Sequence, residues 1–126
     1  MTVVLDASAV LALLLDEPGA DVVAPLTRQA EMSLVNVCEV LSKTAEAGGD
    51  IEATEEIIVS FGIRIRAFTD AHAREVARFR PLTSHLGLSL GDRACLAQVG
   101  FSQLPVLTSD RRMAKADVGV DVRLIR

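Results

Sequence analysis

Val3-Val4-Leu5-Asp6-Ala7-Ser8 contains the first strand expected in the chain and the first candidate functional residue. Residues 3–5 are apolar and mostly β-branched, which predicts a short strand buried on both faces. The strand ends on a carboxylate, and Ser8 is placed to cap a helix over residues 9–15. Because open α/β sheets bind ligands at the carboxyl ends of their strands, Asp6 is a candidate ligand for a divalent metal ion.

Apolar runs and helical stretches alternate along the rest of the chain. Strands are predicted at residues 31–35, 63–68, 105–108 and 120–125, and helices at 20–30, 36–47, 50–61, 70–80, 91–100 and 111–115. Pro25 indicates either a kink in the helix over residues 20–30 or a division of it into two short pieces. Pro81 is expected to end the helix over residues 70–80, and a loop is expected to follow over residues 82–91. This alternation indicates an α/β fold with a mostly parallel sheet of about five strands, in a single domain spanning residues 1–126.

The composition restricts the partners that the chain can bind. Hydrophobic residues make up 50% of the 126 residues but aromatic residues only 3%, which argues against a module that stacks bases on aromatic rings. The net charge is −4, with eleven acidic and two basic residues in residues 1–60, and six acidic and eleven basic residues in residues 61–126. A nucleic acid would therefore need a local arginine-rich surface from the second half.

The sequence indicates neither a disulfide or zinc site nor a membrane-spanning segment. Cys38 and Cys95 lie in apolar helical contexts and are expected to be buried side chains, neither paired in a disulfide nor bound to zinc. The longest apolar run, residues 9–15, is too short to span a bilayer and does not have the form of a signal peptide. A cytoplasmic protein without a membrane segment is expected.

Three further acids occupy places comparable to that of Asp6, namely Glu39, Asp92 and Asp110. Taken singly, each acid is compatible with a helix cap or a solvated helix face. Taken together, they are predicted to meet at the carboxyl edge of the sheet, where four carboxylates repel one another unless a cation is present. Oxygen ligands without clustered His or Cys favour Mg²⁺ or Mn²⁺ over Zn²⁺. Such a site would activate a water for attack on a phosphodiester.

The segments around these acids resemble the acidic motifs of PIN-domain ribonucleases, most closely those of the VapC toxins of bacterial toxin–antitoxin pairs. The matching segments are residues 3–8, 36–40, 88–97 and 104–111, and the resemblance covers essentially the whole chain. It implies a PIN-like three-layer α/β/α fold and a Mg²⁺-dependent endoribonuclease in which Mn²⁺ can substitute. It also implies a homodimer, an RNA substrate and a cognate VapB-type antitoxin.

The resemblance also assigns roles by motif position. The catalytic acids are Asp6, Glu39, Asp92 and Asp110, of which Asp6, Asp92 and Asp110 hold the metal. The supporting polar residues are Ser8, Asn36 and Thr108. Arg93, Arg111 and Arg112 flank two of the acids and are candidate contacts to RNA phosphates, with salt bridges to the acid cluster as the alternative.

Other enzymes whose first strand ends on an aspartate do not fit. A haloacid-dehalogenase-like phosphatase needs a second carboxylate at the position of Ser8. A phosphoacceptor receiver domain needs an adjacent acidic pair after its first strand and a lysine after its last. The alternative that remains is a PIN-like module that binds RNA or protein without cleaving, followed by a purely structural α/β domain.

Overall fold

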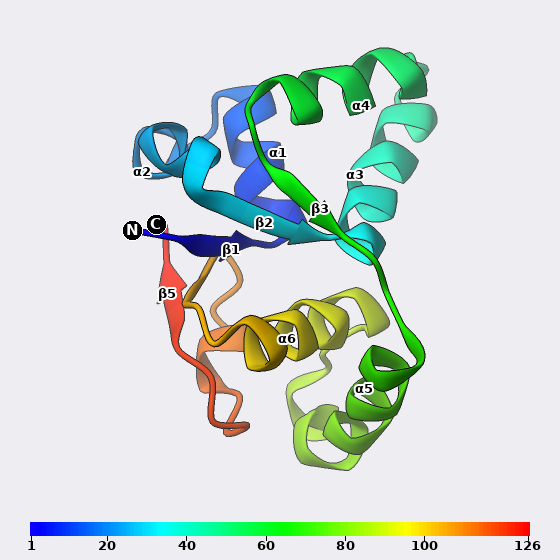
Figure 1. Ribbon diagram of the computed structural model, residues 1–126, viewed down its shortest axis with the longest axis vertical. Helices are drawn as coiled ribbons and strands as arrows, with labels where there is room; N and C mark the ends of the chain where they lie inside the picture. The colour runs from blue at the N-terminus through cyan, green and yellow to red at the C-terminus, as the bar shows by residue number, and fades with distance from the viewer.

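A single parallel sheet lies between two layers of helices in the computed structural model, which describes all residues from 1 to 126 (Figure 1). The strands are β1 (Val3–Leu5), β2 (Ala30–Ser33), β3 (Arg64–Arg66), β4 (Val106–Thr108) and β5 (Val122–Leu124). The helices are α1 (Ala7–Leu15), α2 (Ala20–Val23), α3 (Leu34–Glu46), α4 (Ile51–Ser60), α5 (Asp70–Thr83) and α6 (Leu90–Ser102). Three 3-10 turns, η1 (Ala24–Gln29), η2 (Ser84–Leu86) and η3 (Met113–Lys115), complete the chain. The predicted α/β/α fold is confirmed.

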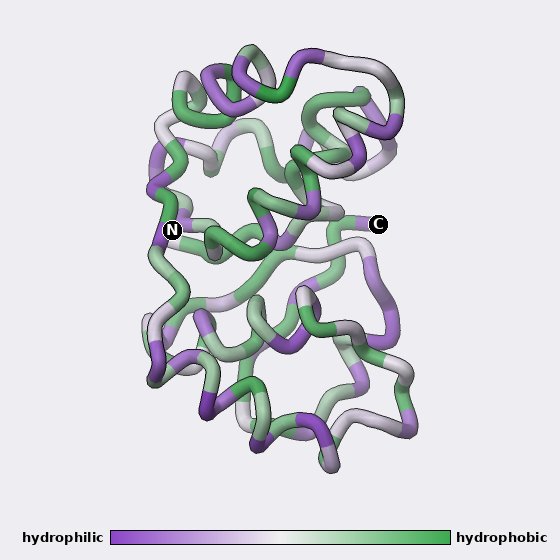
Figure 2. Tube along the Cα trace, turned by 90° about the vertical axis from the view of Figure 1, so that its right-hand side faces the viewer, coloured by the Kyte–Doolittle hydropathy of each residue, from purple (hydrophilic) through white to green (hydrophobic).

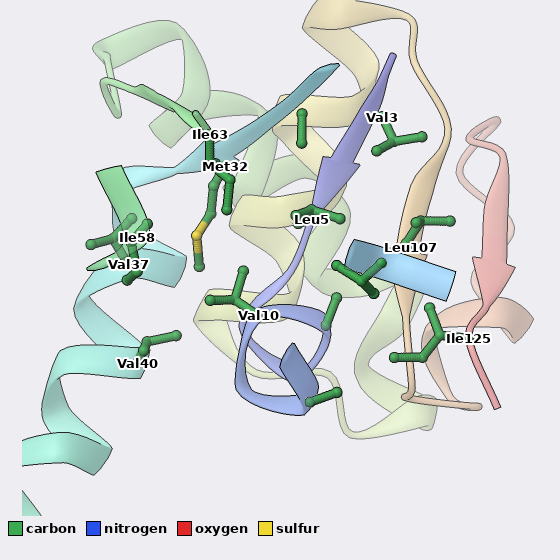
Figure 3. Close-up of a cluster of buried hydrophobic side chains, with 14 residues drawn as sticks. Val3, Leu5, Val10, Met32, Val37, Val40, Ile58, Ile63, Leu107 and Ile125 are labelled. Carbon is green, nitrogen blue, oxygen red and sulfur yellow. The ribbon is translucent and has the colours of Figure 1, made fainter. Parts of the chain in front are cut away.

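Each face of the sheet carries its own hydrophobic core. Helices α1 to α4 cover one face, at the top of Figure 1, and α5 and α6 cover the other. Because side chains alternate along a strand, Val3 and Leu5 join the first core and Val4 joins the second. Leu5 lies in the first core with Val10 of α1 and Met32 of β2 (Figure 3). In Figure 2, green and purple segments alternate along the outer helices, as expected of amphipathic helices.

The strand order determines where along the sheet a ligand site is expected. The sheet order is β3-β2-β1-β4-β5, so the chain builds outward from β1 in one direction and then returns to build in the other. The connections that leave β1 and β4 therefore diverge, and ligands of doubly wound sheets bind in the crevice between them. Asp6 directly follows β1, and Asp110 follows β4 by two residues. The prediction that these strand ends share one edge is confirmed.

Several predicted boundaries differ from those of the structure. Residues 20–30 form two short pieces, α2 and the 3-10 turn η1 that contains Pro25, which is one of the two arrangements predicted from this proline, and Ala30 already belongs to β2. Helix α3 begins at Leu34 because Ser33 caps it, with Oγ 3.3 Å from the Val35 amide nitrogen. Helix α5 continues through Pro81 to Thr83, a buried residue whose hydroxyl donates to the Phe79 carbonyl over 2.8 Å. The predicted loop over residues 82–91 is accordingly reduced by η2 and by the earlier start of α6.

Only one of the two cysteines is buried. Cys95 lies in the second core, as predicted, but Cys38 is exposed because it faces outward from α3. The two thiols are free. None of the helices is both long enough and apolar enough to cross a bilayer.

Candidate active site

Asp6 caps helix α1 and is only 5% exposed. Its Oδ1 accepts hydrogen bonds from the Ala9 amide over 2.9 Å and from the Ser8 hydroxyl over 2.7 Å, and its Oδ2 accepts one from the Thr108 hydroxyl. The prediction that Ser8 caps this helix is wrong, since Ser8 lies in the first turn and supports the actual cap. The carboxylate of Asp6 thus has a fixed orientation at the end of β1.

Two hydroxyl groups join the ends of β1 and β4. Ser8 Oγ lies 3.3 Å from Thr108 Oγ1 and accepts a hydrogen bond from the Ser109 amide over 2.9 Å. Thr108 Oγ1 in turn accepts one from the Asp110 amide over 3.0 Å. The hydroxyls that orient Asp6 therefore also set the path of the backbone that carries Asp110.

Glu39 enters the site from α3, one turn after Asn36 on the same helix. The Asn36 amide nitrogen donates to Glu39 Oε1 over 2.7 Å and to the Gly91 carbonyl over 3.0 Å. Because both of these partners are acceptors, the side-chain amide has one consistent orientation. Its oxygen, Oδ1, is then left buried without a hydrogen-bond partner. Asn36 therefore links Glu39 to the start of α6 by hydrogen bonds, and its Oδ1 remains a free acceptor beside Glu39.

Gly91 makes the close approach of α3 and α6 possible. A Cβ built on Gly91 would overlap the carboxylate of Glu39. Gly91 therefore provides the space in which Glu39 lies, which explains a glycine inside a helix at a position where alanine is otherwise favoured.

Asp92 belongs to the capping box of α6. The Ser89 amide donates to Asp92 Oδ2 over 2.8 Å, and the Asp92 amide lies 3.2 Å from Ser89 Oγ. The helix consequently begins at Leu90, slightly before the predicted start, and Asp92 occupies its first turn. The capping box uses one carboxylate oxygen and leaves Oδ1 of Asp92 free.

Asp110 is paired with an arginine from its own turn. Arg112 donates to Oδ1 of Asp110 from Nε over 3.2 Å and to Oδ2 from Nη2 over 3.0 Å. Nη2 also lies 4.0 Å from Asp92 Oδ2. For Arg112 the salt bridge, which was the alternative to an RNA contact, is therefore present in the structure.

All four acids line one cavity of about 150 Å³. Its lining consists of Asp6, Ala7, Ser8, Leu11, Asn36, Glu39, Lys43, Asp92 and Asp110. As placed, no group of three His, Cys, Asp or Glu side chains converges into a metal-binding cluster. The donor set nevertheless fits a hard divalent cation, because it offers carboxylate oxygens and the unpartnered amide oxygen of Asn36. The lining also includes Lys43 and Leu11, which sequence analysis did not assign to the site.

A family model described as the PIN domain matches residues 3–119. The chain belongs to the PIN-domain family. No curated protein sequence gives a significant match to it.

Among solved structures, this PIN domain is similar to toxin–antitoxin proteins at low sequence identity. VapBC2 from Rickettsia felis, bound to a promoter DNA fragment, has a TM-score of 0.79 at 11% identity, with 98% of each chain covered. VapC20 from Mycobacterium tuberculosis, described as a toxin that cleaves the sarcin-ricin loop, has a TM-score of 0.76 at 15% identity, with 92% of this chain and 95% of that chain covered. FitAcB from Neisseria gonorrhoeae has a TM-score of 0.72 at 23% identity, with 96% of each chain covered. These similarities show the shared fold.

The electrostatics divide the acid cavity of this PIN domain into two halves. Burial raises the pKa of Asp6 from 3.8 to about 6, although the hydrogen bonds from Thr108, Ser8 and Ala9 oppose the shift. Burial also raises the pKa of Glu39, and the negative charge of Asp92 adds to the effect on both groups. For Asp110, hydrogen bonds and the charge of Arg112 outweigh burial and lower the pKa. In the half formed by Asp6 and Glu39 neither acid has an ion-pair partner, and the charge of Lys43 lowers the pKa of Glu39 by less than burial raises it, whereas Asp110 already has a counter-ion.

The other flanking arginines lie differently from Arg112. Arg93 donates from Nη1 to the Val76 carbonyl over 3.0 Å and so connects α6 to α5. Arg111 is exposed and makes no side-chain hydrogen bond or ion pair. Asp117, the next acid after Asp110 in the sequence, is exposed and does not line the cavity.

Proposed function

We propose that this PIN domain is a Mg²⁺-dependent endoribonuclease of the VapC type, acting as the toxin of a type II toxin–antitoxin pair in the cytoplasm. The observation that carries the proposal is the meeting of four acids from four separate segments in one cavity, at the point where the strand order reverses. A purely structural domain has no need to gather carboxylates that repel one another.

In the proposed mechanism Asp6, Asp92 and Asp110 would hold a divalent cation, Mg²⁺ with Mn²⁺ as a substitute, and Glu39 would complete the acidic set. A cation bound here would ionise a water and neutralise charge on the phosphodiester. The protein's own contribution is orientation. Ser8 and Thr108 fix the carboxylate of Asp6, and Asn36 fixes that of Glu39.

The proposed partners are RNA, an antitoxin and a second copy of the chain. An RNA substrate is supported by VapC20, a toxin of the same fold that is described as cleaving the sarcin-ricin loop. A VapB-type antitoxin is supported by the solved VapBC complexes of this fold. A groove of about 590 Å³ adjoins the acid cavity and shares Ser8, Leu11 and Lys43 with it. We infer that an antitoxin tail follows this groove into the cavity, because its apolar lining from α1 and α4 continues directly to the acids.

The proposal is tested by RNA cleavage in Mg²⁺ or Mn²⁺. We expect cleavage to be abolished by EDTA and by Asp6→Asn, with Asp92→Asn and Asp110→Asn similar and Glu39→Gln severely impaired. These substitutions keep the side-chain shape while removing the charge, so a loss of cleavage reports chemistry. Near-normal cleavage by Asp6→Asn would contradict the assignment of Asp6 as a catalytic metal ligand.

The same assay addresses the alternative function, a PIN-like module that binds RNA or protein without cleaving. That alternative is favoured by one observation, the lack of a preformed metal cluster among the acids. Binding of RNA by the wild-type protein with no cleavage in either metal would select it over the nuclease.

A further inference from the structure

All three guanidinium nitrogens of Arg112 donate hydrogen bonds, two of them to the acid site. Nε and Nη2 form a two-pronged contact with the carboxylate of Asp110, and Nη1 donates to the Gly87 carbonyl over 3.1 Å. Gly87 ends η2 with a φ of 68°, a left-handed conformation that suits glycine. The side chain thus joins the turn after β4 to the loop before α6, and holds its charge between Asp110 and Asp92.

The contacts of Arg112 leave Asp110 little capacity for another ligand. A carboxylate oxygen has two lone-pair positions. Oδ1 of Asp110 accepts from the Arg112 backbone amide over 2.9 Å and from Nε over 3.2 Å, which fills both of its positions. Oδ2 accepts from Nη2 and keeps one position. Asp110 therefore offers a cation at most one lone pair while Arg112 remains in place.

The other three acids are bound differently. Asp6 also keeps one lone-pair position, on Oδ2, but all of its hydrogen-bond donors are neutral, whereas Glu39 and Asp92 each keep one carboxylate oxygen that accepts no hydrogen bond. No arginine or lysine forms an ion pair with Asp6 or Glu39. Arg112 therefore supplies to Asp110 and Asp92 the positive charge that a divalent ion would otherwise supply.

We propose that Arg112 is an intramolecular competitor of the divalent cation: it holds Asp110 in the metal-free protein, leaves this carboxylate a single free lone pair, and thereby lowers the affinity of the site for the ion. This inference rests on the proposed function, in which the cavity holds a cation. It assigns to Arg112 a role distinct from a phosphate contact, namely setting the affinity of the site for metal. Arg112 acts through Asp110 and is thus a positioning residue.

The test measures binding of Mn²⁺ by calorimetry and by the electron paramagnetic resonance signal of free Mn²⁺, with no RNA present. We expect Arg112→Gln to tighten Mn²⁺ binding by about fivefold or more, a typical coupling between two ligands that compete. The matched control is Arg111→Gln, which removes the same charge from the adjacent residue without touching an acid and should change Mn²⁺ affinity by less than about twofold. In EDTA, Arg112→Gln should also melt below the wild type, because the acids lose their counter-ion.

A double-mutant cycle separates direct competition from general electrostatics. Competition through Asp110 requires the gain from Arg112→Gln to disappear in an Asp110→Asn background. Unchanged or weaker Mn²⁺ binding by Arg112→Gln would overturn the inference, and so would an equal gain in the Asp110→Asn background. In either case the nuclease proposal would survive if the wild type binds Mn²⁺. Failure of both the wild type and Arg112→Gln to bind Mn²⁺ would overturn the inference and the proposed metal site together.

Discussion

Replacing Asp6 by Asn should stabilise the metal-free protein at neutral pH, although it removes a candidate catalytic group. Burial raises the folded-state pKa of Asp6 from 3.8 to about 6. A rise of this size corresponds to about 3 kcal/mol of unfolding free energy that is lost when the buried carboxyl is ionised. Asn keeps the shape and can accept the same hydrogen bonds from Ala9 and Ser8 through its oxygen. Its amide would face Thr108, whose hydroxyl can rotate to accept.

The pH dependence of this effect follows from the sign of the shift. A carboxyl whose folded pKa lies above its unfolded value stabilises the fold fully only below the unfolded pKa, and this stability is lost as pH rises through about 6. The gain from Asp6→Asn should therefore be small near pH 4 and reach about 1–3 kcal/mol at pH 7.5, after allowing for the loss of charge-assisted hydrogen bonds. For a domain of this size, such a gain raises the melting temperature by roughly 4–12 °C.

Thermal melts followed by circular dichroism in EDTA, at pH 4 and pH 7.5, measure the effect directly. The matched control is Asp110→Asn, which removes a carboxylate from the same cavity but one whose pKa Arg112 lowers. We expect no stabilisation from the control at pH 7.5, because it breaks a favourable pair. Mg²⁺ should raise the melting temperature of the wild type by mass action and leave Asp6→Asn nearly unchanged. If Asp6→Asn melts below the wild type at pH 7.5, the cap role of Asp6 outweighs the burial of its charge and the reasoning fails.

Three further outcomes are expected. Gly91→Ala should displace Glu39 and weaken Mn²⁺ binding by about tenfold, which is within the range for changes around metal ligands. The control is Gly100→Ala in the same helix, whose added Cβ meets no neighbouring atom and which should leave Mn²⁺ binding unchanged. Thr108→Val should destabilise the protein by about 1–3 kcal/mol, because it removes a hydrogen bond to Asp6. The loss should be larger at pH 8, where Asp6 is ionised, than at pH 4. The control is Thr83→Val, which breaks only a hydrogen bond to the Phe79 carbonyl and whose cost should be the same at both pH values. Light scattering should find a homodimer at tens of micromolar protein, with a Kd in the micromolar range or tighter, through apolar side chains such as Leu15 and Val22 that α1 and α2 expose; a monomer alone at that concentration would contradict it.

The parts of the site that sequence analysis could predict depend on strand ends. Apolar runs that end on Asp6 and near Asp110 predict two strands, and parallel pairing then brings these acids to one edge without knowledge of side-chain contacts. Asn36 and Glu39 are one helical turn apart, so their shared face could also be predicted, even though α3 begins earlier than expected.

The parts that could not be predicted depend on contacts between distant segments. Nothing local in the sequence shows that Gly91 makes room for Glu39 of α3, or that Arg112 bonds the Gly87 carbonyl. The same is true of Glu31, a buried carboxylate in β2. Burial alone would raise its pKa, but hydrogen bonds from Ser102, Arg66 and Gln98 lower it. Arg66 Nη2 lies 2.8 Å from Glu31 Oε2, a contact between two separate strands that no local pattern indicates.

The structural and the functional interpretations of the acids turn out to be compatible. Asp6 caps α1, Asp92 forms the capping box of α6, and Asp110 accepts the Arg112 backbone amide. In each case backbone N–H groups orient the carboxylate, and at a helix start they also favour its negative charge. These local bonds let the fold tolerate acids that repel one another, and they leave at least one oxygen of each carboxylate able to accept a further ligand. A carboxylate that caps a helix can therefore also be a metal ligand, because the capping hydrogen bonds hold it in place.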